Sequence, residues 1–285
     1  MKFRDDSAFL NDINALKAHA VREGYLFLKG ILDRGLLLSA RDAIADCLTE
    51  YGYCTNGSNS TGLPVHQYPE QDFYGSGIDA EAYKALQRLE ELHAVAHSQG
   101  LHYLMRSILG VTPLLHPNFI LRTIFPNAFA IPAHQDLLHT RGSVNTWTCW
   151  IPLTDCPRQL GGLTLLPRTH SKALPTRPQH NGGRETILDN ISAKDWIGGD
   201  FNLGDVLVFH GLTVHRALPN RSEDQLRISM DCRFQPPNEA IRQITLEPHG
   251  QLQTWDDIYA GWKRRDNCWY WRKFNLVPIQ EPSAN

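Results

Sequence analysis

Three side chains in this sequence could bind a metal ion together: His134, Asp136 and His215. The first two are separated by one residue, and in an extended strand side chains two positions apart project from the same face. A second imidazole from a neighbouring strand can then complete the set. Two nitrogen ligands and one oxygen ligand, with the opposite positions open, form the ligand set of non-haem Fe(II) oxygenases. We therefore expect an iron site.

The third ligand has a competitor in the same stretch of sequence. His210 and His215 both follow the apolar run 206–209, and the Pro219-Asn220 turn after His215 favours the latter. A His-x-Asp spacing alone is weak evidence, because it arises by chance in a chain with 13 histidines. A surface turn or a satisfied polar pair would explain it equally well.

The segment 225–234 alternates polar and apolar residues along its whole length, which is typical of a half-buried strand. One face carries Arg227, Ser229, Asp231 and Arg233. Two arginines on one face are costly if that face is a dry core, but not if it lines a cavity that holds an anion. Arg227 would then bind a carboxylate through its planar guanidinium. The alternative is a sheet surface that faces solvent.

The remaining pattern predicts helices followed by strands. Helices are expected over 7–23, capped by Ser7 and ended by Gly24, and over 33–51 and 79–97, with a short strand at 25–28. The stretch 52–77 is expected to be a loop or lid. From residue 113 to 234 the pattern changes to short strands with turn signals, interrupted by a long connection at 175–199.

These elements indicate a mainly β fold with flanking helices, built on a double-stranded β-helix, which is a cupin-like jelly roll. We expect a single domain over 1–285, because no linker divides the chain and the expected ligands lie far apart in sequence. It would have a helical N-terminal part (1–112), a jelly-roll core (113–235) and a C-terminal extension (236–285). Four tryptophans of the extension are expected to pack against the outside of the barrel.

In these motifs the sequence resembles the phytanoyl-CoA dioxygenase family of Fe(II)/2-oxoglutarate-dependent oxygenases. The resemblance runs from about residue 24 to 235 and includes Gly24-Tyr-Leu-Phe-Leu-Lys-Gly30, His134-Gln-Asp136 and Trp150-Ile-Pro-Leu153. It continues through the segment 161–170 and the stretch from Gly204 to His215, which Arg227 follows. Within the family the chain is most similar to bacterial hydroxylases of small natural products, including those that act on terpenoid acids.

The resemblance implies a role for each matching residue. His134, Asp136 and His215 would bind iron, and Arg227 would bind the distal carboxylate of 2-oxoglutarate. Trp150 matches a position beside the co-substrate, and Arg122 is a further candidate for contact with it. From strand parity and position we also expect three residues on the substrate side of the site: Arg233, Arg168 and His139.

The implied reaction is hydroxylation of an unactivated C–H bond in a small organic substrate, with O2 consumed and 2-oxoglutarate converted to succinate. Asp136 favours hydroxylation over halogenation, because halogenating relatives replace this carboxylate with a small residue. Desaturation and ring closure stay open. Two other functions also stay open: a Zn- or Mn-dependent hydrolase or isomerase on the same barrel, and a jelly-roll binding protein without catalysis.

Composition narrows the choice of partners and compartment. A formal net charge of −2 without a basic stripe argues against nucleic acid. The sequence has no run of membrane-spanning length and no signal-peptide pattern at residue 1. Six cysteines without a Cys-x-x-Cys pair indicate free thiols in a reducing compartment, which we expect to be the cytoplasm. The oligomeric state, monomer or homodimer, stays open.

Overall fold

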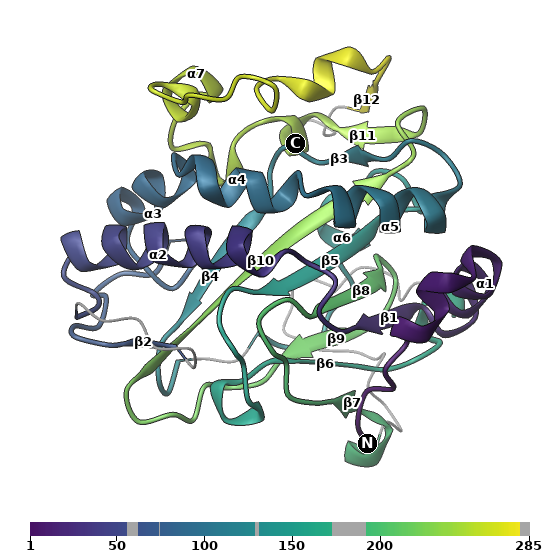
Figure 1. The fold of residues 1–285 in the computed structure, drawn as a ribbon, viewed down its shortest axis with the longest axis horizontal. Coiled ribbons are helices and arrows are strands. Elements are labelled where there is room, and N and C mark those ends of the chain that lie inside the picture. Colours follow the sequence, from purple (N-terminus) through teal and green to yellow (C-terminus); the bar gives the residue numbers. More distant parts are fainter. Residues whose placement is uncertain (56–61, 74, 129–130, 173–191, 280–285) are drawn as a thin grey trace, which may run out of the picture.

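Two antiparallel β-sheets enclose the centre of the molecule in the computed structural model, which describes residues 1–55, 62–73, 75–128, 131–172 and 192–279 (Figure 1). In the larger sheet the order is β1-β8-β5-β10, and β2, β3 and β4 pair with the other edge of β10. The smaller sheet has the order β7-β6-β9. The strands are β1 Tyr25–Leu28, β2 Leu63–Pro64, β3 Leu114–Leu115, β4 Ile120–Ile124, β5 Trp147–Pro152, β6 Leu163–Leu165, β7 Ile197–Gly198, β8 Val206–His210, β9 His215–Ala217, β10 Gln225–Gln235, and a separate parallel pair, β11 Ala240–Arg242 and β12 Val277–Ile279.

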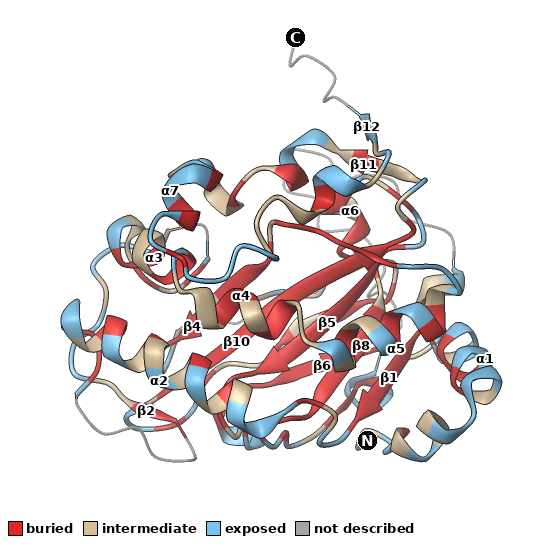
Figure 2. Ribbon diagram, turned by 45° about the horizontal axis from the view of Figure 1, so that its top comes forward, coloured by how far each residue is buried: buried red, intermediate tan, exposed pale blue. Residues whose placement is uncertain are grey.

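Helices cover the outer face of the larger sheet (Figures 1 and 2). The α-helices are α1 Ile13–Glu23, α2 Arg34–Glu50, α3 Ala80–Gln87, α4 Glu90–Ala96, α5 Gln99–Leu109, α6 Leu137–Thr140 and α7 Trp255–Tyr259. Short 3-10 helices occur at Ser7–Asn11, Arg158–Leu160, Thr169–Ser171, Ala193–Asp195, Gln243–Leu246, His249–Gln251 and Tyr270–Lys273.

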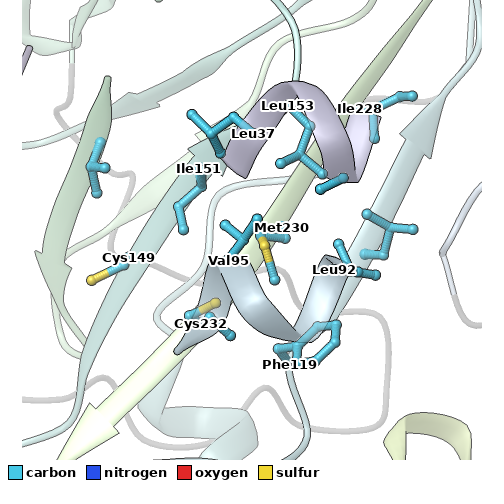
Figure 3. Close-up of a cluster of buried hydrophobic side chains, with 14 of the residues drawn as sticks. Leu37, Leu92, Val95, Phe119, Cys149, Ile151, Leu153, Ile228, Met230 and Cys232 are labelled. Carbon is cyan, nitrogen blue, oxygen red and sulfur yellow. The ribbon is translucent and has the colours of Figure 1, made fainter. Parts of the chain in front are cut away.

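Because polar and apolar residues alternate along β10, its two faces differ: one is apolar and the other is polar. Leu226, Ile228, Met230, Cys232 and Phe234 are fully buried in the core between this sheet and the helices. Figure 3 shows Ile228, Met230 and Cys232 in the same cluster as Leu37, Leu92 and Val95 of the helices. Each such side chain contributes about 1.5–3 kcal/mol through burial. The polar face points between the two sheets. The alternation thus distinguishes core from cavity as expected, and the surface alternative for this strand is wrong.

Two predicted helices differ from those observed. The first helix begins at Ile13, and its cap is Asp12, whose carboxylate accepts a hydrogen bond from Ala15 N, so Ser7 is not the cap. Gly24 ends this helix in a left-handed conformation, as predicted. The expected helix at 79–97 breaks in two at Leu89, where the backbone is extended.

The break at Leu89 has a local cause. The buried His93 ring donates from Nε2 to the Gln87 carbonyl oxygen over 2.9 Å. This side-chain bond satisfies a carbonyl that a continuous helix would otherwise pair with a backbone N–H. The chain can therefore change direction there without leaving a buried carbonyl unpaired.

The C-terminal extension packs through its own aromatic cluster. Trp255, Trp262 and Trp271 are buried together with Tyr259, and Trp262 Nε1 donates to the Arg88 carbonyl oxygen at the end of α3. Residues 56–61 and 74 of the expected lid, and 175–191 of the expected long connection, lie outside the described residues. None of the helices in the described ranges is long and apolar enough to cross a membrane.

Candidate metal centre

The smaller sheet brings the two histidines of the predicted triad together. His215 begins β9, and His134 pairs with it through an isolated antiparallel bridge, with backbone N···O distances of 3.0 Å in both directions. Asp136 does not share a strand with His134, so this part of the prediction is wrong. Its backbone is helical (φ −61°, ψ −33°) and it immediately precedes α6. The carboxylate therefore reaches the two imidazoles from a turn.

The three side chains converge on one point between the sheets. Asp136 Oδ1 lies 3.6 Å from His134 Nε2 and 3.7 Å from His215 Nε2. One ligand atom from each residue lies within 4.8 Å of the other two, which a single metal ion can span. Among the described residues no other group of three histidine, cysteine or acidic side chains is arranged in this way.

Hydrogen bonds to both imidazoles fix which nitrogen faces the centre. His134 Nδ1 donates to the Pro132 carbonyl oxygen over 2.8 Å, and His215 Nδ1 donates to that of Thr213 over 3.0 Å. A carbonyl can only accept, so Nδ1 carries the proton in each ring. The Nε2 lone pairs are then available for a metal, in the arrangement usual for metal-binding histidines.

The second oxygen of Asp136 is held by the larger sheet. Oδ2 accepts hydrogen bonds from Thr148 Oγ1 of β5 over 2.7 Å and from Arg233 Nε of β10 over 3.1 Å. Thr148 and Arg233 are direct neighbours in the register of these strands. Oδ2 is thereby occupied, which leaves Oδ1 as the oxygen that faces the imidazoles.

The charges of the cluster suit a divalent cation. Burial would raise the pKa of Asp136, but the Arg233 guanidinium and the two imidazoles hold it well below its usual value. Burial lowers the pKa of His215 to about 4, so this ring is neutral at neutral pH. Burial also acts to lower the pKa of His134, but its bond to Asp136 outweighs this and raises it. Asp136 as a carboxylate and His215 as a neutral imidazole are in the protonation states that bind a metal, and metal binding would displace a proton from His134 Nε2.

A cavity that is open to solvent adjoins the three side chains. Arg227 enters it from β10 and Trp150 from β5. The apolar part of its wall consists of Ile131, Leu163 and Ala217. Arg122, Asp231 and Arg233 complete the lining, and the cavity therefore combines a metal-binding cluster with three guanidinium groups.

Arg227 is a fully buried cation without an acidic partner in the described part of the chain. One terminal nitrogen donates to the Gly161 carbonyl oxygen, whereas Nε and Nη2 have no partner there. Burial lowers the pKa of Arg227 to about 10, so it stays charged at neutral pH. Trp150 Nε1 and Ser229 Oγ are buried without partners as well. These unmatched donors fit the carboxylate of a ligand that enters from the cavity.

The other expected site residues occupy different positions. Arg122 lines the cavity, but its guanidinium is engaged by Asp231 (3.2 Å) and by the Gly75 carbonyl oxygen (2.9 Å). Arg168 lies outside the cavity lining, because Glu23 draws it into a surface ion pair at the end of α1 (2.8 Å). The expectation that Arg168 contacts substrate is wrong for this structure.

Two histidines near the cluster do not join it. The exposed His139 follows Asp136 by three residues on α6, its ring lies 5.7 Å from that of His134, and it is not part of the cavity lining. His210 ends β8, and its Nδ1 accepts a hydrogen bond from Leu212 N over 3.1 Å. Of the two competitors for the third position, the structure brings His215 and not His210 to the centre.

Sequence reasoning missed Thr148 and the pairing of Arg122 with Asp231. Thr148 precedes Trp150 by two residues on the same strand, so strand parity could have placed both on the cavity side. The Arg233–Asp136 contact joins residues 97 positions apart, and no local pattern predicts it.

We expect Thr148→Val to lower the affinity for Fe(II) by about tenfold to a hundredfold, since loss of a group that orients a metal ligand has effects of that order. The substitution keeps the side-chain shape and removes only the bond to Asp136. Anaerobic titration of metal-free protein with Fe(II) measures the change, and Thr164→Val in the smaller sheet is the matched control. Equal affinity in parent and Thr148→Val would show that Thr148 does not orient the carboxylate.

Comparison with known proteins places this geometry in a family. The family model for phytanoyl-CoA dioxygenase (PhyH) matches residues 21–229. Two relatives described as 1-deoxypentalenic acid 11-beta-hydroxylase, from Streptomyces arenae and Streptomyces exfoliatus, are 27% and 26% identical to the chain. The matches cover 82% and 81% of this chain, and 85% and 84% of the relatives.

Solved structures share the fold. The non-haem alpha-ketoglutarate-dependent epimerase SnoN from nogalamycin biosynthesis aligns with a TM-score of 0.57 at 20% identity, over 81% of this chain and 86% of its own. The carbocyclase SnoK from the same biosynthesis aligns with a TM-score of 0.58 at 20% identity, over 84% and 89%. The expected double-stranded β-helix and the resemblance noted in the sequence are both confirmed, and the chain belongs to the phytanoyl-CoA dioxygenase family.

Proposed function

We propose that the chain is an Fe(II)- and 2-oxoglutarate-dependent dioxygenase that hydroxylates an unactivated C–H bond of a small natural-product-like substrate. Family membership and the hydroxylases among its relatives support the oxygenase class. One observation carries the assignment to this site: a His-Asp-His cluster and an uncompensated buried arginine share a single cavity.

In this proposal His134 Nε2, Asp136 Oδ1 and His215 Nε2 hold the iron. Arg227 binds the distal carboxylate of 2-oxoglutarate, with Trp150 Nε1 beside it as a further donor. Bound Fe(II) supplies the centre at which O2 is activated while 2-oxoglutarate is converted to succinate and CO2. The protein's part is to orient both substrates and to keep water out, and the apolar wall of Ile131, Leu163 and Ala217 suits the second task.

The setting of the reaction is part of the same proposal. All six cysteines are free thiols, and five of them are buried, which suits a reducing cytoplasm that also keeps iron ferrous. The partners would be small molecules and not nucleic acid. Because the relatives are hydroxylases of 1-deoxypentalenic acid, terpenoid and other lipophilic acids are the first compounds to screen.

We expect succinate release to require Fe(II), 2-oxoglutarate and O2 together. Removing the metal with a chelator should abolish the release, Fe(II) should restore it, and Zn(II) should not, because Zn(II) has no redox chemistry. The measurement is succinate formed during a screen of lipophilic acids. Product formation without O2 or 2-oxoglutarate would instead indicate a hydrolase or isomerase on this barrel.

A further inference from the structure

The charges that line the cavity do not cancel. Three guanidinium groups, on Arg122, Arg227 and Arg233, face two carboxylates, on Asp136 and Asp231. The described lining therefore carries one positive charge in excess. Because charges in a confined, partly desolvated space must be matched closely, the ligands of this cavity have to bring the balancing negative charge.

Two of the three arginines have definite partners under the proposed function, on which this inference rests. Arg122 is paired with Asp231, and its contact with the Gly75 carbonyl oxygen uses a further N–H. Arg227 is matched by the distal carboxylate of 2-oxoglutarate. The positive charge of each of these two arginines is therefore already paired, and neither would bind a second anionic substrate.

Arg233 differs, because its partner Asp136 is also the carboxylate of the metal cluster. Fe(II) brings two positive charges, and Asp136 together with the proximal carboxylate of 2-oxoglutarate brings two negative ones. Once Asp136 neutralises the metal, it no longer fully neutralises Arg233. The single excess positive charge then resides at Arg233.

The geometry leaves Arg233 able to bind an anion. Its side chain is only 9% exposed, lines the cavity, and donates to Asp136 through Nε. Among the described residues its terminal nitrogens have no hydrogen-bond partner. A guanidinium held by Nε can still present two parallel N–H donors, which match the two oxygens of a carboxylate.

We propose that Arg233 binds the carboxylate of the second substrate, so that this substrate is a monocarboxylic acid whose apolar body lies along Ile131, Leu163 and Ala217. Metal loading is required for tight binding, because the metal then shares the charge of Asp136, the carboxylate to which Arg233 is hydrogen-bonded.

The test compares cyclohexanecarboxylate with its neutral analogue cyclohexanecarboxamide, titrated without oxygen into protein loaded with Fe(II) and 2-oxoglutarate. We expect the acid to bind at least tenfold more tightly than the amide, and this preference to shrink in the metal-free protein. Arg233→Gln should remove the preference, and Arg233→Lys should keep part of it. Arg41→Gln on the outer helix α2, where Arg41 pairs with Asp42, is the control that should keep all of it.

Several outcomes would overturn the proposal. Equal binding of acid and amide by the parent protein, or a preference that survives Arg233→Gln, would place the anion site elsewhere or nowhere. A loss of 2-oxoglutarate affinity in Arg233→Gln, with the acid unaffected, would assign Arg233 to the co-substrate. If Arg233→Gln does not fold, the metal dependence of acid binding by the parent protein still tests the proposal: acid binding that is equally tight without metal would contradict it. If Fe(II) and 2-oxoglutarate do not bind at all, the proposed function itself is refuted, which differs from a failure of the Arg233 proposal alone.

Discussion

His215→Ala is expected to abolish succinate formation, whereas His210→Ala is expected to retain it. The two histidines are five positions apart and follow the same apolar strand, but only His215 directs Nε2 at Asp136. Loss of His215 would remove one of the three proposed protein ligands and leave the metal with two. His210 accepts a hydrogen bond from Leu212 N. Its replacement should lower the free energy of unfolding by about 1 kcal/mol and leave the metal ligands unchanged.

The measurement is 2-oxoglutarate-dependent succinate release, together with circular dichroism to show that both variants are folded. His134→Ala should behave as His215→Ala does, because the two imidazoles are equivalent in their contacts to Asp136. Retention of full turnover in His215→Ala, or its loss only in His210→Ala, would refute the ligand assignment.

Arg227→Met is expected to raise the apparent KM for 2-oxoglutarate well over tenfold. A hydrogen bond to a charged group contributes roughly 1.5–3 kcal/mol, which corresponds to about tenfold to more than a hundredfold in affinity. Methionine occupies a similar volume without the charge. Arg41→Met on α2 is the matched control, because it removes an arginine that lies outside the cavity lining.

The same substitution has an unusual expected effect on stability. Arg227 is fully buried, and within the described residues it lacks an anionic partner and leaves two nitrogens unbonded. Replacing such a group with an apolar one removes an uncompensated charge, although the Gly161 carbonyl oxygen loses its donor. We expect Arg227→Met without ligands to be at least as stable as the parent in urea unfolding. A fall of several kcal/mol would show that Arg227 has a structural role instead.

Local sequence patterns predicted the parts of this site that local geometry determines. The alternation along 225–234 depends only on strand parity, and it separated Arg227, Asp231 and Arg233 from the apolar face that meets the helices. Gly24 was predicted as a helix end because a left-handed conformation there suits glycine. The order and spacing of His134, Asp136 and His215 predicted the cluster itself.

The features that local sequence patterns did not predict depend on contacts between segments far apart in the chain. Asp136 was expected in a strand, but Thr148 and Arg233 hold its carboxylate on a turn, and neither contact follows from the His-x-Asp spacing. Arg168 has the residue type of a substrate anchor, yet Glu23 at the end of α1 draws it to the surface. The strongly periodic helix can break at Leu89 because His93 hydrogen-bonds to the Gln87 carbonyl oxygen, which the break would otherwise leave unpaired.

Anaerobic titration of the metal-free protein with Fe(II), followed by 2-oxoglutarate, tests the central claim most directly. We predict one Fe(II) per chain and a visible absorption band that appears only when 2-oxoglutarate joins the iron. Asp136→Ala should bind both Fe(II) and 2-oxoglutarate more weakly than the parent protein does. Arg227→Met should bind Fe(II) as tightly as the parent but require far more 2-oxoglutarate. Absence of iron binding in the parent protein, or binding unaffected by Asp136→Ala, would contradict the account.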